Sequence, residues 1–278
     1  MTDSYPKPSQ SGTYVLGHSD RELDRLSAQA RLLNPITTRF LREAGIVRGM
    51  RVLDVGTGVG DVSFVAADLV GDKGEVIGVD REPTALAVAR SRANAASLTN
   101  VSFCEGDPSE MAFEQPFDAI IGRYVLLFQK NPTQMLQKLV PHVKLGGVIA
   151  FHEPNVVAHS YPVSPMWDRC CQWVAETFRQ NSNEMQMGGK LFSTFLAVGL
   201  PPPEVRVEAI LRGGANSYDL VNWIVGLVGT LLPSMERLGI VVAADVDLDT
   251  LAARMTDEIV ANASVVMRHL EVGAWCRK

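Results

Sequence analysis

Between residues 45 and 154 the chain repeats one arrangement several times: a short apolar segment, then a stretch in which apolar residues recur with helical spacing. The apolar segments are 51–55, 75–79, 101–105, 117–121 and 148–152. Strands buried on both faces have this composition, and their alternation with helices is typical of parallel sheets with crossover connections. The sequence therefore predicts a doubly wound α/β fold.

Segments outside this repeat are expected to complete one elaborated domain. A sixth strand at 205–211 and a final strand at 273–276 would give a mostly parallel, Rossmann-like sheet of seven strands. Two stretches rich in Trp, Phe and Met interrupt the pattern and are expected to form helical insertions. The predicted organisation is an N-terminal lid and helix at 1–44, a cofactor-binding core at 45–154, a cap insertion at 155–189, a continuation of the core at 190–212, a second helical insertion at 213–270 and a final strand at 271–278.

The composition is that of an ordinary soluble globular enzyme. Of the 278 residues, 46% are hydrophobic and 21% are charged, as in ordinary globular domains. The formal net charge is −5. This balance argues against nucleic acid as a partner, because surfaces that follow a phosphate backbone need clustered Lys and Arg.

The sequence also argues against a membrane or secreted protein. Residues 1–11 are polar, and the longest apolar stretch, 221–232, is too short to span a bilayer. The four cysteines show no C-x-x-C spacing and are expected to stay reduced. We therefore expect a cytoplasmic protein with no membrane partner, either a monomer or a homodimer.

The segment 52–60, V-L-D-V-G-T-G-V-G, predicts a strand that runs into a glycine loop and then a helix. Glycines let the backbone turn tightly and approach a ligand closely. Their spacing differs from the G-x-G-x-x-G of dinucleotide enzymes. Asp80 ends the second strand, where it is placed to accept hydrogen bonds from ribose hydroxyls, and Asp107 ends the third, where it is placed to accept from an exocyclic amine.

These residues resemble the class I S-adenosylmethionine-dependent methyltransferase family, and most closely its ubiquinone-biosynthesis-type small-molecule branch. The resemblance spans residues 33–200 and rests on five motifs: D-V-G-T-G-V-G from Asp54, G-V-D ending at Asp80, E-G-D ending at Asp107, F-D-A-I-I from Phe117 and L-G-G-V-I-A from Leu145. It implies S-adenosyl-L-methionine as the cofactor. It also implies that Asp54 and the glycine loop hold the methionine end, Asp80 the ribose and Asp107 the adenine amine.

Two residues depart from the family pattern. Pro108 has no N–H to offer to adenine, so either Ser109 replaces that donor or the bond is absent. Arg81 stands where an apolar stacking residue is usual, and its guanidinium can stack on the ring instead. With a polar contact from Gln29 and the backbone near Arg123, the cofactor-binding residues implied by the resemblance are Gln29, Asp54, Gly56, Thr57, Gly58, Gly60, Asp80, Arg81, Gly106, Asp107, Pro108 and Arg123.

Methyl transfer from a sulfonium is an in-line displacement, so alignment and exclusion of water supply most of the rate. A general base matters chiefly when the acceptor is a hydroxyl. His152 and Glu153 end the fifth strand and are candidates, although they can equally cap the following loop. Tyr14 and His18 are further candidates because the N-terminal segment folds over the cofactor in similar enzymes. The histidines show no metal-ligand spacing, so no metal is expected.

The aromatic insertions favour a hydrophobic or aromatic metabolite, methylated on O, N or C. Two other functions remain open from the sequence. One is an S-adenosylmethionine-binding protein with a non-methylating activity on this fold, because fold does not fix reaction. The other is an NAD-dependent oxidoreductase, which the glycine spacing disfavours.

Overall fold

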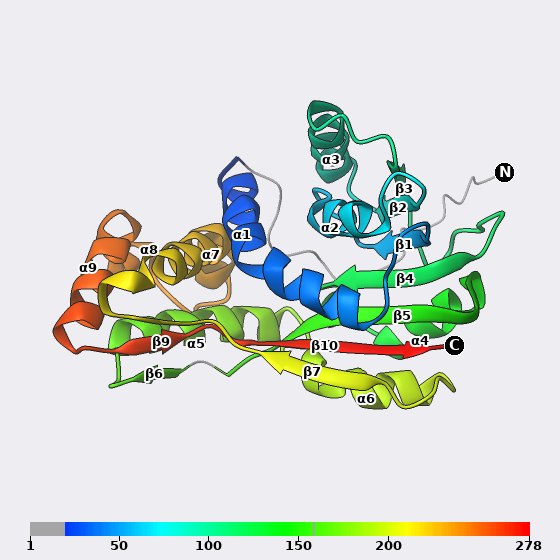
Figure 1. Cartoon of the computed structure of the whole chain (residues 1–278). Helices are drawn as coiled ribbons and strands as arrows, with labels where there is room; N and C mark the ends of the chain where they lie inside the picture. The colour runs from blue at the N-terminus through cyan, green and yellow to red at the C-terminus, as the bar shows by residue number, and fades with distance from the viewer. Residues whose placement is uncertain (1–19, 158) are drawn as a thin grey trace, which may run out of the picture.

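A seven-stranded sheet forms the centre of the molecule (Figure 1). The structure is a computed structural model that describes residues 20–157 and 159–278. All strands run parallel except β10, which lies antiparallel to both of its neighbours. The prediction of a mostly parallel seven-stranded sheet is confirmed. Across the sheet the order is β3 (Val101–Glu105), β2 (Glu75–Asp80), β1 (Arg51–Val55), β4 (Phe117–Arg123), β5 (Val143–Asn155), β10 (Leu270–Arg277) and β7 (Glu204–Glu208).

Helices cover both faces of the sheet (Figure 1). On one face lie α1 (Asp20–Glu43), α2 (Asp61–Val70) and α3 (Pro83–Ala95). On the other face α4 (Pro132–Leu139) and α6 (Met187–Ala197) pack against apolar side chains of β1, β4, β5 and β10. Covering helices explain why the central strands are apolar throughout, since neither face meets water.

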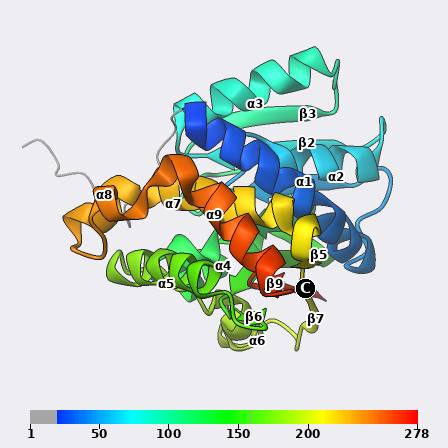
Figure 2. The ribbon, with the colours of Figure 1, turned by 90° about the vertical axis from the view of Figure 1, so that its left-hand side faces the viewer.

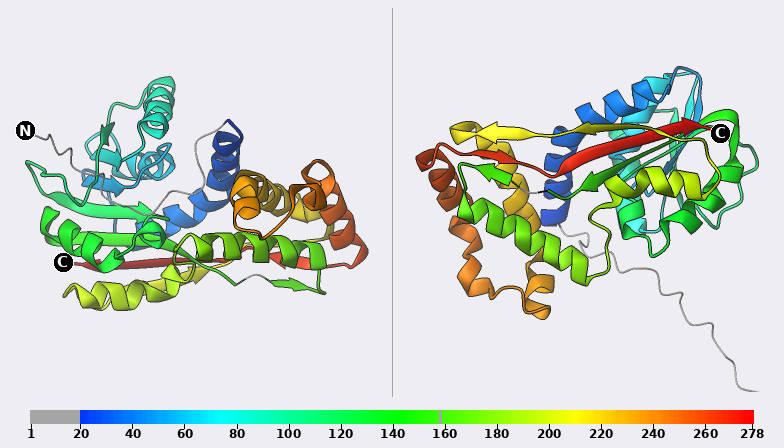
Figure 3. Two further views of the ribbon diagram at one scale, coloured as in Figure 1. Left: turned by 180° about the vertical axis from the view of Figure 1, so that it is seen from behind. Right: turned by 90° about the horizontal axis from the view of Figure 1, so that it is seen from below.

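The remaining elements form a cap beside the carboxyl edge of the sheet (Figures 2 and 3). It contains α5 (Pro165–Gln180), α7 (Tyr218–Arg237), the short α8 (Ala243–Val246) and α9 (Leu248–Ala261). A small antiparallel sheet accompanies them, in the order β6 (His159–Tyr161), β9 (Val265–Met267) and β8 (Leu211–Gly213). Among the described residues, no helix combines the length and the apolar character needed to cross a membrane.

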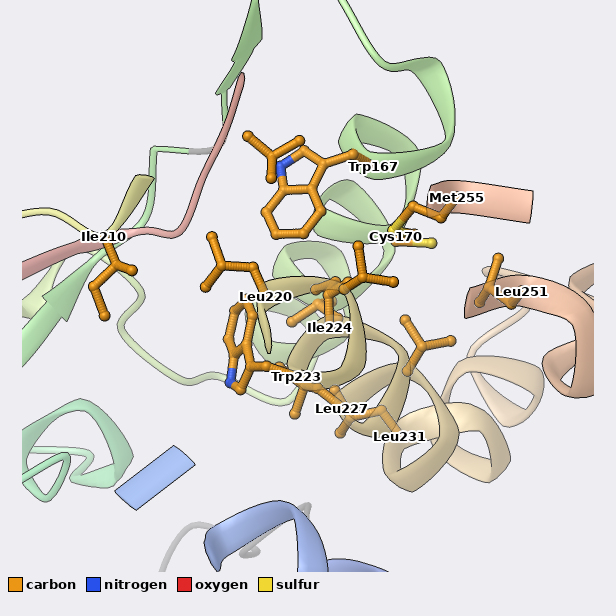
Figure 4. Packing of buried hydrophobic residues seen from close by; sticks show 14 of the residues in the cluster. Trp167, Cys170, Ile210, Leu220, Trp223, Ile224, Leu227, Leu231, Leu251 and Met255 are labelled. Atoms are coloured by element: carbon orange, nitrogen blue, oxygen red, sulfur yellow. The ribbon is translucent and has the colours of Figure 1, made fainter. Parts of the chain in front are cut away.

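The cap has a hydrophobic core of its own. Figure 4 shows side chains of α5, α7 and α9 pointing toward one another, among them Trp167, Leu231 and Met255. All three are fully buried, and each such burial stabilises the fold by about 1.5–3 kcal/mol. This core continues into α1 through Leu33 and Phe40, so α1 joins the cap to the sheet.

Two predicted elements differ from the structure. The strand expected at 205–211 divides into β7 and β8, because β7 pairs with β10 in the main sheet whereas β8 pairs with β9 in the small one. The helix expected to continue to Leu270 ends at Ala261. Ala263 has φ +49°, and the Ser264 N–H donates to the Ile259 carbonyl over 2.9 Å, which closes the helix in a Schellman-type turn.

Candidate active site

A cavity of about 480 Å³ lies between the carboxyl ends of the central strands and the cap. This volume is within the range of small-molecule binding sites. At the sheet end its walls include Gly56, Thr57, Gly58, Asp80, Arg81, Pro108 and Arg123. At the cap end they include Tyr124, Val174, Phe178, Trp223, Ile224, Leu227, Arg268 and His269.

The glycine loop has the backbone geometry that a close ligand contact requires. Gly56, Gly58 and Gly60 have φ values of +65°, +54° and +90°, a region that disfavours side chains. A Cβ built on Gly58 would meet no atom within 4 Å, so the backbone there faces open space in the cavity. The N–H groups of Gly56 and Thr57 donate to the Val79 carbonyl over 2.9 and 3.1 Å, which fixes the loop on β2.

Asp80 lines the cavity beside this loop. Its Oδ2 accepts the Gly58 N–H over 2.7 Å, and its Oδ1 accepts the Glu82 N–H over 3.0 Å. Each carboxylate oxygen can accept a second hydrogen bond. Asp80 therefore fits a ligand with two adjacent hydroxyls, such as a ribose.

Asp54 lies beneath the loop and is 1% exposed. Its Oδ2 accepts from the Ser63 hydroxyl over 2.6 Å, while Oδ1 has no hydrogen-bond partner in the part of the chain that the structure describes. Burial raises the pKa of Asp54 to about 6. Asp54 does not belong to the cavity wall, so its predicted contact with the methionine end stays a prediction.

Asp107 pairs with neighbouring side chains, and its predicted contact with the adenine amine stays a prediction. Its carboxylate accepts from the Ser109 N–H and hydroxyl over 2.9 and 2.8 Å and forms an ion pair with Arg81. Burial opposes ionisation of Asp107, but these donors outweigh it and lower its pKa. Arg81 and Pro108 line the cavity, whereas Gly106 and Asp107 do not. In this conformation the Asp107 carboxylate is occupied by Arg81 and Ser109.

Gln29 and Arg123 both line the cavity, as their predicted cofactor contacts require. The Arg123 guanidinium donates to Asn34 Oδ1 and to Thr37 Oγ1, each over 2.9 Å. Burial lowers the pKa of Arg123. These contacts tie β4 to α1 at the sheet end of the cavity.

The predicted catalytic residues do not meet at the cavity. Glu153 is fully buried, and its carboxylate accepts the N–H groups of Val125, Leu126 and Leu127 over 2.9, 2.8 and 3.3 Å. Burial raises its pKa to about 7. Glu153 therefore caps the short helix η1 (Leu126–Phe128). It is not part of the cavity wall, and its predicted contact with an acceptor stays a prediction.

His152 is also buried and is not part of the cavity wall, so its predicted contact with an acceptor likewise stays a prediction. Its ring packs edge-on against Phe40, with 4.9 Å between ring centroids. Its Nδ1 lies 3.2 Å from Thr37 Oγ1. Tyr14 and His18 lie outside the described residues.

A buried polar cluster that the sequence prediction missed lies at the cap end of the cavity. Glu271, at the start of β10, is fully buried. The Tyr124 hydroxyl lies 2.8 and 2.7 Å from its two oxygens, His152 Nε2 lies 2.8 Å away, and Arg268 forms an ion pair with it. His269 Nε2 lies 2.8 Å from the Tyr124 hydroxyl and 3.3 Å from Glu271. The available signal was R-H-L-E at 268–271, three polar residues next to an apolar strand.

Tyr124 and Arg268 show how the cluster is held together. Tyr124 has φ +59°, an uncommon conformation for a bulky residue that a packed environment must maintain. The Arg268 guanidinium lies over the Trp223 ring, 4.3 Å from its centroid. Burial raises the pKa of Tyr124 and lowers that of His269 well below its usual value, so both side chains are neutral at pH 7.

The strand order, the glycine loop and Asp80, which fits a ribose, together define a class I S-adenosylmethionine-binding methyltransferase fold. The family model described as "Methyltransferase domain" matches residues 46–197. The chain belongs to this family and is an S-adenosylmethionine-dependent methyltransferase of its small-molecule branch. The functional prediction is thereby confirmed over the NAD-dependent and non-methylating alternatives.

Three similar proteins illustrate the match. Aklanonic acid methyltransferase DauC of Streptomyces sp. (strain C5) is 32% identical over 154 residues, which are 55% of this chain and 69% of that protein. A 2-phytyl-1,4-naphtoquinone methyltransferase of Synechococcus elongatus is 36% identical over 111 residues, 38% of this chain and 48% of that protein. The crystal structure of YcgJ from Bacillus subtilis has a TM-score of 0.55 at 17% identity, covers 88% of this chain and 99% of its own, and shows the shared fold.

Proposed function

We propose that the chain transfers a methyl group from S-adenosylmethionine to a small, flat, apolar acceptor of the quinone or aromatic polyketide class. One observation carries this proposal: a single cavity joins the glycine loop and Asp80 at one end to a wall of aromatic and aliphatic cap side chains at the other. Phe178, Trp223 and Leu227 form part of that wall. Apolar walls with a few convergent polar groups favour ligands of this kind.

The residues of the cavity have separate roles in this proposal. The glycine loop approaches the methionine end, Asp80 accepts both ribose hydroxyls, and Arg81 with Pro108 bounds the adenine. Gln29 and Arg123 face the amino-acid end. When bound, the cofactor supplies an electrophilic methyl group on a sulfonium sulfur. The cap aligns the acceptor with that methyl group and excludes water, which are the main contributions a protein makes to such a displacement.

The names of two relatives support the acceptor class. Aklanonic acid and 2-phytyl-1,4-naphtoquinone are the compounds named for the proteins that match over 55% and 38% of this chain. The apolar wall of the cap supports the same acceptor class independently of these names.

Calorimetry with S-adenosylhomocysteine and a methylation assay test the proposal. We expect micromolar binding to the wild type, weakened about 100-fold in Asp80→Ala because two hydrogen bonds to a charged group are lost. Asp72→Ala, an exposed residue, is the matched control. Methylated product should form from hydroxylated naphthoquinones or anthraquinones. Absence of cofactor binding to the wild type would contradict the cofactor site, and binding without product from any of these quinones would contradict the acceptor class.

We further infer that the enzyme works in the cytoplasm as a monomer or a homodimer, without nucleic acid. The net charge of −5 and four unpaired cysteines support this inference. Light scattering on purified protein, with and without added RNA, tests it. A stable species larger than a dimer, or co-elution with RNA, would contradict it.

A further inference from the structure

Two histidines contact the same buried carboxylate, but they differ in what else they reach. His152 and His269 place their Nε2 atoms 2.8 and 3.3 Å from oxygens of Glu271. The His152 ring packs on Phe40, and His152 is not part of the cavity wall. His269 belongs to that wall, and 12% of its side chain is exposed. Of the two, His269 is the one that a bound acceptor meets.

The surroundings of His269 determine which ring nitrogen carries the proton. An ionised carboxylate only accepts hydrogen bonds, so a lone pair on Nε2 would face Glu271 unfavourably. With the proton on Nε2, the imidazole donates toward Tyr124 and Glu271, and the Tyr124 hydroxyl donates to Glu271. Nδ1 then carries the lone pair. Within the described residues, Nδ1 has no hydrogen-bond partner.

The charges around His269 keep this imidazole neutral. Burial lowers its pKa well below the usual value, and the nearby Arg268 and His152 lower it further. Glu271 balances Arg268, with which it forms a buried ion pair. Tyr124, the remaining titratable group in contact, is neutral because burial raises its pKa. His269 is therefore neutral at pH 7, so one of its ring nitrogens carries a lone pair.

We propose that Nδ1 of His269 is the general base that removes the proton from an acceptor hydroxyl during methyl transfer. This inference rests on the proposed function and names the acceptor atom as oxygen. The oxygen–methyl bond forms as the carbon–sulfur bond breaks, and the electron pair of that bond stays on sulfur. The acceptor proton moves to Nδ1, and Glu271 stabilises the imidazolium that results, as the acid does in other His–carboxylate pairs.

Arg268, Tyr124 and His152 act through other groups. The Arg268 guanidinium forms an ion pair with Glu271 and so holds that carboxylate beside the imidazole. Tyr124 holds both the imidazole and the carboxylate. His152, which does not line the cavity, donates to Glu271. These three are positioning residues, whereas His269 touches the substrate.

Nuclear magnetic resonance tests the proton position without turnover. The chain has five histidines, so a long-range ¹H–¹⁵N spectrum of their side chains is simple, and His269→Asn identifies the signals of interest. In the wild type with S-adenosylhomocysteine we expect the Nε2–H pattern for His269. Added juglone, a hydroxynaphthoquinone, should shift the Nδ1 resonance. Two results would overturn the proposal. One is an Nδ1–H pattern for His269. The other is an unshifted Nδ1 resonance of His269 in a sample where added juglone moves the signals of other residues that line the cavity.

The pH dependence of juglone methylation separates a base from a structural residue. In His269→Asn we expect kcat at pH 7 to fall about 100-fold with little change in KM. The loss should shrink as the pH rises and juglone ionises unaided. The matched control is His159→Asn on exposed β6, which should behave as the wild type. An equal loss at every pH, or no loss, would overturn the proposal.

Two measurements distinguish failure of this inference from failure of the proposed function. Binding of S-adenosylhomocysteine should be unchanged in His269→Asn, because the residue lies at the cap end. Tyr124→Phe, which keeps the ring and removes the hydroxyl, should lower kcat less than His269→Asn. If the wild type and His269→Asn methylate juglone equally well, only the general-base role of His269 is contradicted. If the wild type binds no cofactor, the proposed function itself is contradicted.

Discussion

The two ends of the cavity are built by different physical means. At the sheet end, backbone groups and Asp80 present hydrogen-bonding atoms that are fixed by short loops between neighbouring strands. At the cap end, Tyr124, Arg268, His269 and Glu271 form a buried network of charged and neutral side chains. The first arrangement depends on local backbone conformation, whereas the second depends on desolvated charges that must stay paired. Substitutions at the cap end should therefore affect stability most, and those at the sheet end should affect ligand binding most.

The largest effect is expected at the centre of the cap-end network. Glu271→Ala removes one member of a buried ion pair, and we expect the free energy of unfolding to fall by about 3–5 kcal/mol, measured by urea denaturation. Glu176→Ala removes the carboxylate from an exposed ion pair with Arg179 and should cost less than about 1 kcal/mol. Similar losses in the two variants would remove the distinction between the ends of the cavity.

A smaller effect is expected from Glu153, which is fully buried at the end of β5. Its pKa is raised from 4.5 to about 7 by burial, so the folded state binds a proton more readily than the unfolded chain. Its stabilising contribution is therefore lost as the pH rises from about 4.5 to 7. Glu153→Gln lacks this titration and should gain on the order of 2 kcal/mol relative to the wild type across that window. Parallel urea midpoints between pH 4.5 and 8 would contradict this.

The smallest effect is expected in the glycine loop. Gly58→Ala places a side chain at φ +54° and should cost about 1 kcal/mol of stability. Gly49→Ala is a matched control, because Gly49 has φ +86° and equally open surroundings outside the cavity. Both variants should lose similar stability by thermal unfolding, but Gly58→Ala alone should weaken S-adenosylhomocysteine binding, by about 10-fold. Equal binding in the two variants would argue that the loop does not meet the cofactor.

The sheet end was accessible from the sequence because its determinants are local. The glycines at 56, 58 and 60 follow a buried strand directly, and Asp80 ends the next strand. Topology alone then brings these strand ends together. The position of Asp107 at the end of the third strand follows from the same logic, but its contacts with Ser109 and Arg81 do not, because they depend on side-chain competition that no spacing rule describes.

The cap end could not be derived in the same way. Glu271 meets Tyr124 and His152 across sequence separations of 147 and 119 residues. That meeting depends on the register in which β10 pairs with β5, where Glu271 lies opposite Pro154. A sequence pattern fixes the existence of the last strand, but its register depends on how the intervening insertion packs.

The strand β10 has a further consequence for motion. The chain leaves the small cap sheet after β9, crosses at residues 268–269 and then forms β10, which pairs with β5 from Leu270 to Arg277 (Figure 3). The helix α1 contributes Phe40 to the cap core and Leu41 to the sheet core. Two parts of the chain thus connect the halves: the crossing from β9 to β10, and the helix α1, which contains Pro35. A proline inside a helix removes a backbone hydrogen bond and favours a kink at that point. Movement of the cap relative to the sheet should therefore concentrate at residues 268–269 and around Pro35, because bending there leaves the β5–β10 ladder intact.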